Sequence, residues 1–289
     1  MSNGISTRQN EEKYINHLAA QRQLYNEVKL WDNVNMMLSV ILPLILAISQ
    51  IVFKNIEVLK SLSYLLSLVS MLIAAFLDNC VSKKKKLAAY IQQCFDVYVY
   101  QMPWDKKLFG SEKNVINNIA EKSKILLRKN GEKEKLLNWY TSVADGLELK
   151  KGILVCQKEN FNWDVNLRKK YKKASISVVA FLILIIFGIG IFENESFITI
   201  LYRISFIAPM LRWLINVIKQ LNNDINNLME LDGMINSPEE KEIEELQEIQ
   251  AKLYNHRKAC LAIPNFFYKW NKGNDEDVAY RSAKMDTEE

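Results

Sequence analysis

Four apolar runs, arranged as two pairs, most constrain what this chain can fold into. A helix rising ~1.5 Å per residue needs about 20 apolar residues to cross a ~30 Å hydrocarbon core. Each run comes close to that length, so the sequence predicts an all-α integral membrane protein with four spans. The runs are Val34–Phe53, Val58–Leu77, Ala174–Phe192 and Phe197–Ile218.

The connections within the pairs predict two tight helical hairpins. Only residues 54–57 join the first two runs, and only residues 193–196 join the last two. Lysines and arginines crowd the opposite ends of the hairpins, at 83–86 and 168–173. By the positive-inside rule, we expect both termini and the central segment to be cytosolic.

The predicted hairpins, 34–77 and 174–218, leave three cytosolic parts. These are an N-terminal helix (1–33), a central insert (78–173) and a C-terminal region of helices and flexible tail (219–289). The insert holds 21 Lys and Arg against 11 Asp and Glu, whereas the tail holds 9 against 15. We expect the three parts to form one helical domain whose basic insert attracts an anionic ligand.

Apolar residues at helical spacing predict several helices outside the membrane. In the tail, Ser237 and Glu240 match a capping box at a helix start. The stripe that follows predicts packing either on a second copy or on the protein's own cytosolic domain. The predicted segments are Gln9–Trp31, running into the first span, Leu87–Tyr100, Val115–Lys129 and Lys133–Lys150, and the stripe is Ile243, Leu246, Ile249 and Leu253.

Motifs for metal, disulfide or cofactor chemistry are missing from the sequence. Its four cysteines form no CxxC pair, and His17 and His256 are too far apart to suggest a ligand cluster. Neither a Walker loop nor a dinucleotide fingerprint is present. We therefore expect no cofactor and no enzymatic activity.

Polar residues inside the apolar runs are candidates for a pore or a gate. Arg203 and Arg212 are nine residues apart, which places them on opposite faces of an unbroken helix. They could extend to opposite interfaces, or one could line a water-filled path. Ser63 and Ser67 could line a pore or allow close helix packing.

Four local motifs lie outside the predicted spans. They are Ala20-Gln21-Arg22 with Leu24-Tyr25, Met102-Pro103-Trp104, Cys156-Gln157 with Trp163-Asp164 and Arg168, and Ile249-Gln250 with His256-Arg257. Together with two hairpins around a cytosolic insert, they resemble the SMODS-associating four-transmembrane effector family of bacterial anti-phage signalling systems. The resemblance covers nearly the whole chain.

This resemblance implies a CBASS-type effector in the bacterial inner membrane. Such an effector binds a cyclic oligonucleotide through its cytosolic part, and its membrane part then assembles into a homo-oligomer or opens to disrupt the bilayer. No DNA or RNA polymer is expected as a partner. Arginines would contact phosphates and aromatic rings would stack on bases. The predicted ligand-contacting residues are Arg22, Tyr25, Trp104, Trp163 and Arg168.

Each of these residues also has a purely structural interpretation. Trp163 fits an aromatic belt at the membrane interface, Trp104 a plug in the helical core, and Arg168 a topology charge. Arg22 could pair with a carboxylate near its own helix. The alternative function is a non-enzymatic membrane scaffold that recruits a soluble partner through its C-terminal helix.

Overall fold

A computed structural model describes residues 2–53, 56–111, 115–159, 164–205, 207–237, 239–264, 266–267 and 270, and every regular element in these ranges is helical. The α-helices are α1 (Ile5–Gln9), α2 (Glu12–Met36), α3 (Leu42–Val52), α4 (Glu57–Val99), α5 (Lys106–Phe109), α6 (Ile116–Leu127), α7 (Leu149–Glu159), α8 (Asp164–Phe192), α9 (Phe197–Ser205), α10 (Ala208–Ile235) and α11 (Ile243–Ala259).

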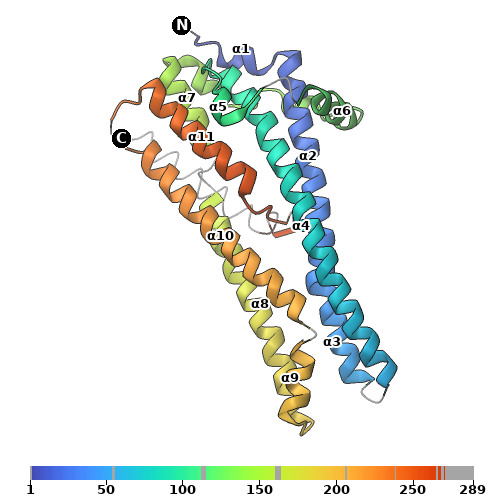
Figure 1. Cartoon of the computed structure of the whole chain (residues 1–289). Coiled ribbons are helices and arrows are strands. Elements are labelled where there is room, and N and C mark those ends of the chain that lie inside the picture. Colours follow the sequence, from blue (N-terminus) through green and yellow to red (C-terminus); the bar gives the residue numbers. More distant parts are fainter. Residues whose placement is uncertain are drawn as a thin grey trace.

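Two long helical hairpins run the length of the molecule (Figure 1). In the first, α2 and α3 lie against α4, and in the second, α8 lies against α9 and α10. Both hairpin tips point to one end, while α1, α5, α6 and α7 gather at the other. We call the end with these small helices and α11 the head, and the rest of the hairpins the stem.

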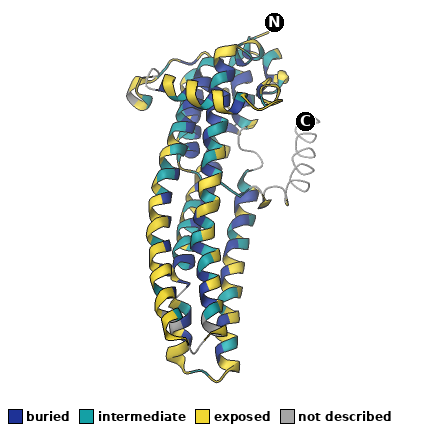
Figure 2. Cartoon of the chain, turned by 90° about the vertical axis from the view of Figure 1, so that its right-hand side faces the viewer, coloured by how far each residue is buried: buried dark blue, intermediate teal, exposed yellow. Residues whose placement is uncertain are grey.

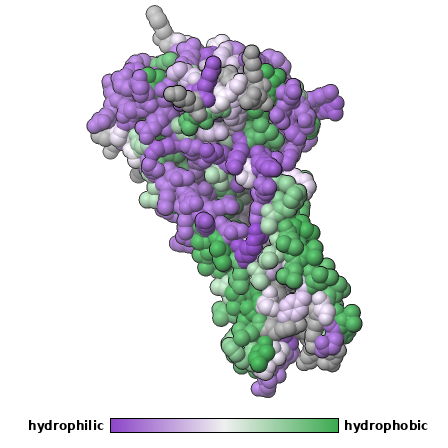
Figure 3. Space-filling model, viewed as in Figure 1, coloured by the Kyte–Doolittle hydropathy of each residue, from purple (hydrophilic) through white to green (hydrophobic). Residues whose placement is uncertain are grey.

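The stem exposes large apolar side chains, as the green lower half of Figure 3 and the yellow residues of Figure 2 show. Phe192 is 88% exposed, and Val58 and Ile198 are each 78% exposed. Within the described ranges, three helices are long and apolar enough to cross a membrane, and a fourth span results if α9 and α10 are counted as one. These features make the chain a membrane protein, as the apolar runs predict.

The first span continues a helix of the head, as predicted. A π-helical segment, Met37–Ile41, joins α2 to α3 without a break, and Pro43 is the second residue of α3. Proline has no N–H to donate, and its ring clashes with the carbonyl oxygen four residues earlier. Widening the turn before Pro43 accommodates this clash while the helix continues.

The fourth apolar run is not one straight helix. α9 ends at Ser205, α10 begins at Ala208, and the two axes differ by 59°. Pro209 lies in the first turn of α10, where a missing N–H costs nothing. The prediction that Arg203 and Arg212 lie on opposite faces of one helix is therefore wrong, because it assumed 900° of unbroken rotation.

The core of the head combines residues from all three parts of the chain outside the apolar runs. Leu18 of α2, Phe95 of α4, Ile153 of α7 and Leu246 of α11 belong to one buried cluster. The apolar stripe of α11 is covered by this cluster, with Leu246 and Ile249 at 0% exposure. The stripe thus packs on the protein's own head, and the alternative of packing on a second copy is wrong.

Two predictions of helix boundaries in the head are also wrong. α11 starts after Glu242, whose side chain forms the capping box with Glu245, not at Ser237. Residues 133–150 form two short 3₁₀ turns, 134–136 and 142–146, before α7 begins. The Gln9 amide explains the interruption: it accepts from the Tyr140 N–H at 2.7 Å and donates to the Tyr140 carbonyl at 3.2 Å, replacing helical hydrogen bonds.

Candidate ligand-binding site

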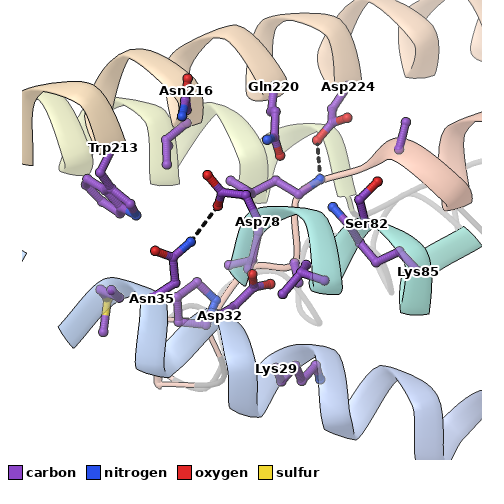
Figure 4. A pocket seen from close by; sticks show the side chains of 18 of the residues that line it. Lys29, Asp32, Asn35, Asp78, Ser82, Lys85, Trp213, Asn216, Gln220 and Asp224 are labelled. Atoms are coloured by element: carbon purple, nitrogen blue, oxygen red, sulfur yellow. Dashed lines mark hydrogen bonds between the residues drawn. The ribbon is translucent and has the colours of Figure 1, made fainter. Parts of the chain in front are cut away.

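A pocket of about 620 Å³ lies where the two hairpins enter the head (Figure 4). α2, α4 and α10 line it, together with residues 258–264 at the end of α11 and beyond. Asn35, Asp78 and Gln220 come from three different helices and point into the same space. We call this space the junction pocket.

Basic and amide side chains dominate the lining of the junction pocket. Five basic residues face three carboxylates, so the lining carries an excess of positive charge. Tyr171 and Trp213 add aromatic surface. The basic residues are Lys29, Lys85, Lys86, Arg212 and Lys258, the acids are Asp32, Asp78 and Asp224, and the amides are Asn33, Asn35, Asn216, Gln220, Asn223, Asn226 and Asn227.

An ion pair between the hairpins forms part of this lining. Arg212 of α10 donates to the Asp78 Oδ2 of α4 at 3.1 Å. Asn35 of α2 donates to the Asp78 Oδ1 at 2.5 Å, and Ser39 donates to the Asn35 amide oxygen at 3.2 Å. Asp78 therefore connects the two helices of the first hairpin with the second hairpin. We call the contact between Asp78 and Arg212 the inter-hairpin ion pair.

Asp32 is a second carboxylate of interest in the lining. Its Oδ2 is buried and has no hydrogen-bond partner among the described residues. A buried carboxylate oxygen without a partner costs free energy that a donor on a ligand could recover. The pocket thus offers an unsatisfied acceptor beside its cationic groups.

A buried polar network holds α11 to the first hairpin in the head. Asp96 of α4, which is 0% exposed, accepts from Arg257, from Gln250 at 2.9 Å and from the Tyr140 hydroxyl at 2.7 Å. Burial lowers the pKa of the Arg257 guanidinium, but Asp96 and Tyr140 together outweigh this effect and raise the pKa above its ordinary value. Burial, and then Asp96, raises the pKa of Tyr140, so its hydroxyl stays protonated as a donor.

A second network holds α11 to the other hairpin. Arg168 of α8 donates to Asp164 at 2.8 Å, to Asp224 of α10 at 2.5 Å and to the Leu261 carbonyl at 3.1 Å. His256 lies 3.7 Å from Asp164. Because His256 directly precedes the Arg257 of the first network, one turn of α11 connects the roots of both hairpins.

Comparison with known sequences decides the family. The profile of the SMODS-associating 4TM effector domain matches residues 3–285. The chain belongs to this family. A Bacillus cereus protein described as a probable CBASS effector molecule is similar to it, with 25% identity covering 93% of this chain and 94% of that protein. No solved structure matches the effector.

Of the residues predicted to contact a ligand, the four that the structure describes do not line the junction pocket of this effector. The Trp104 Nε1 donates to the Gly110 carbonyl at 2.7 Å, and its ring packs edge-on against Tyr90. Arg168 is buried in the second network, so its guanidinium already has partners. Trp163 lies outside the described residues.

Arg22 and Tyr25 lie on α2, one turn or more before Lys29, the first residue of the pocket lining. Both are half-buried, and Tyr25 packs on a small apolar cluster with Leu24. Their contact with a ligand stays a prediction.

The four residues predicted for a pore or gate have internal partners or are buried in the effector. Ser63 donates to the Leu59 carbonyl of its own helix at 2.8 Å, and Ser67 is 6% exposed, as close helix packing requires. Arg203 is buried and pairs with Glu195 at the hairpin tip, and Arg212 forms the inter-hairpin ion pair.

Sequence reasoning missed Asp78 and Asn35. Asp78 directly follows the second apolar run, and Arg212 lies near the end of the fourth, so opposite charges occur at the same predicted membrane face. Opposite charges at one membrane face were the sequence signal for an ion pair between the hairpins. The signal does not identify which acid pairs with which base, because the two residues are separated by 134 positions in the sequence.

Proposed function

We propose that this membrane protein is an anti-phage effector that binds a cyclic oligonucleotide in the junction pocket and then disrupts the bilayer. The observation that carries this proposal is the junction pocket itself, a basic cavity where both hairpins meet the head. A ligand bound there contacts α2, α4 and α10 at once. It therefore has a direct means of changing how the hairpins pack.

The size and chemistry of the pocket suit a cyclic dinucleotide. Its volume of about 620 Å³ lies within the ~300–1,000 Å³ typical of small-molecule sites. Lysines and an arginine favour phosphodiester anions, amides can pair with base edges, and Trp213 and Tyr171 offer surfaces for stacking. The family and its probable CBASS relative add support from sequence.

Membrane disruption in this proposal requires several copies or a rearrangement. Ala47, Val179, Ile186 and Met210 pack into one apolar cluster between the hairpins, which leaves little lumen within one copy. A homo-oligomer in the bacterial inner membrane is therefore part of the proposal. So are cytosolic termini, from the positive-inside rule, and a mechanism without a catalytic step.

The alternative function, a membrane scaffold, was suggested by the apolar stripe of α11. A partner recruited through α11 would need its apolar stripe, and that stripe is buried in the head. The junction pocket gives a small ligand a place that a scaffold would not need. We therefore favour the effector.

Thermal unfolding in detergent tests the binding step. The midpoint would be measured with cyclic di-AMP, cyclic di-GMP, cyclic GMP–AMP and cyclic tri-AMP, with their linear products as controls. We expect one cyclic species to raise it, because a ligand that binds only the folded state stabilises by mass action. No increase with any of them would refute the proposed ligand class.

A matched pair of lysine variants tests the pocket. Lys86 lines it, whereas Lys83 is exposed in the same basic run outside the lining. Lys86→Gln and Lys83→Gln remove the same charge, so only Lys86→Gln should reduce the ligand-induced shift. If both variants reduce the ligand-induced shift equally, the ligand is attracted by the overall positive charge of this region and not by the pocket. Dye leakage from liposomes with the stabilising ligand then tests membrane disruption.

A further inference from the structure

The inter-hairpin ion pair is accessible from the junction pocket. The Arg212 side chain is 32% exposed and the Asp78 side chain 44% exposed, and both belong to the pocket lining. A solute that enters the pocket can therefore reach the guanidinium. By contrast, Arg168 is 6% exposed and enclosed by Asp164 and Asp224.

The partners of the two residues are unequal. Asp78 also accepts a 2.5 Å hydrogen bond from Asn35, whose amide is oriented by Ser39. It can therefore keep a donor from its own hairpin if Arg212 turns away. A guanidinium binds a phosphodiester with the same two-pronged geometry as a carboxylate, so an anionic ligand can take the place of Asp78.

We propose that Arg212 receives a phosphodiester of the cyclic ligand, and that Asp78 occupies this position until the ligand enters, so that binding breaks the inter-hairpin ion pair. This inference rests on the proposed function. After the exchange, the Asp78 carboxylate faces the negative charge of the ligand. An attraction between α4 and α10 is thereby replaced by repulsion.

This exchange provides the differential affinity that a ligand-driven change requires. A ligand shifts a conformational equilibrium only if it binds one arrangement more tightly than the other. While the inter-hairpin ion pair is formed, the ligand competes with Asp78 for Arg212. This competition ends when the hairpins separate at the pocket. The ligand therefore favours separated hairpin roots.

Two substitutions distinguish the role of the ion pair in holding the hairpins together from the role of Arg212 in binding the ligand. Asp78→Asn and Arg212→Gln both remove the ion pair, so both should raise dye leakage from liposomes without any ligand. Their ligand binding should differ. Asp78→Asn removes a competitor and should bind the active cyclic nucleotide as tightly as the wild type or more tightly. Arg212→Gln should bind it about 10- to 100-fold more weakly, the usual effect of losing a charged hydrogen bond.

Two further variants serve as controls. Exchanging the charges, Asp78→Arg with Arg212→Asp, should restore low leakage without ligand, which a merely misfolded protein would not do. Glu230→Gln removes an ion pair with Lys252 between α10 and α11, outside the pocket lining, and should leave leakage and binding unchanged. All variants are compared after confirmation of wild-type elution in size-exclusion chromatography.

Membrane lipids offer the same phosphodiester chemistry. Short-chain phosphatidylglycerol is therefore titrated in detergent alongside the cyclic nucleotides. Stabilisation by the lipid alone, lost in Arg212→Gln, would assign Arg212 to a headgroup and overturn the proposal. Wild-type binding by Arg212→Gln would overturn the receptor role, and no leakage from Asp78→Asn without ligand would overturn the role of the ion pair.

Failure of the proposed function has a different signature. In that case the wild type binds none of the cyclic nucleotides, and the receptor role of Arg212 falls with it. The leakage of Asp78→Asn and its reversal by the charge exchange still decide whether the ion pair holds the hairpins together.

Discussion

The buried pair of Asp96 and Arg257 gives the sharpest prediction about stability. Asp96 is 0% exposed, and the Arg257 side chain is 10% exposed. Arg257→Met removes one of three hydrogen-bond donors to Asp96 and leaves the carboxylate without its counter-charge. Breaking a buried ion pair in this way costs about 3–5 kcal/mol. Because Tyr140 and Gln250 remain as donors, we expect the lower end, about 3 kcal/mol.

A loss of this size is measurable by thermal unfolding in detergent, followed by tryptophan fluorescence. For chains of this size, 1 kcal/mol shifts the midpoint by about 2–4 °C, so Arg257→Met should lower it by about 6–12 °C. Adding Asp96→Asn should recover at least half of the loss, because it removes the unpaired charge and keeps an acceptor for Tyr140. Lys252→Gln is the control: it removes a cation from a partly exposed pair, which is worth about 0–1 kcal/mol.

Either of two outcomes would refute this prediction. Equal decreases of the midpoint in Arg257→Met and Lys252→Gln would mean that burial gives the Asp96 pair no special importance. A double variant no more stable than Arg257→Met would mean that lost packing, and not the unpaired charge, causes the loss.

Three further predictions concern the head and the stem. Burial lowers the pKa of His17, so the stability of the folded state is fully present above the unfolded pKa of about 6.5 and falls as the pH drops below it. Acidification from pH 7.5 to 5.5 should therefore lower the unfolding midpoint of the wild type more than that of His17→Gln, and equal shifts would contradict this. Leu246→Ala should lower the free energy of unfolding by about 2–5 kcal/mol, as measured by chemical denaturation, because this side chain is completely buried; a loss below about 1 kcal/mol would contradict the packing described. Gly190→Ala should cost about 1–3 kcal/mol, because a Cβ would lie 2.5 Å from Ile200, whereas Gly188→Ala meets nothing within 4 Å and should be tolerated; equal midpoints would refute the close approach of α8 and α9.

Several elements follow from local sequence. The helix before the first span and the helix ending just before Tyr100 are confirmed, because both depend on apolar periodicity within one segment. The stripe of α11 is also confirmed as a packing surface, and only its partner required the structure. In each case the sequence signal and the structural feature involve the same neighbouring residues.

The wrong predictions share a physical cause. Residues 133–150 contain buried residues at helical spacing, but a side chain 131 residues away, Gln9, binds the backbone of Tyr140 and interrupts the helix. α11 starts at the capping box of Glu242 and not at Ser237, and the Glu242 carboxylate also pairs with Lys150 of α7, which is 92 residues away in the sequence. In both cases, contacts between residues distant in the sequence outweighed the helix propensity of the local segment.

The candidate site shows the same division. The concentration of basic residues around the hairpin roots could be inferred from the sequence, and Lys85 and Lys86 of the basic run do line the pocket. The individual contacts could not. Trp104 and Arg168 carry the chemistry expected of a ligand site, but the fold uses them for internal packing and pairing.

The sequence by itself determined that this protein enters a membrane, folds as helical hairpins and belongs to its effector family, because length, hydropathy and local motifs are properties of contiguous residues. The tertiary structure decided which charges meet. Asp78 and Arg212 are 134 residues apart, and Asp96 and Arg257 are 161 apart. Their pairing depends on how four long helices and α11 pack together, and that packing places a polar pocket where the two hairpins enter the head.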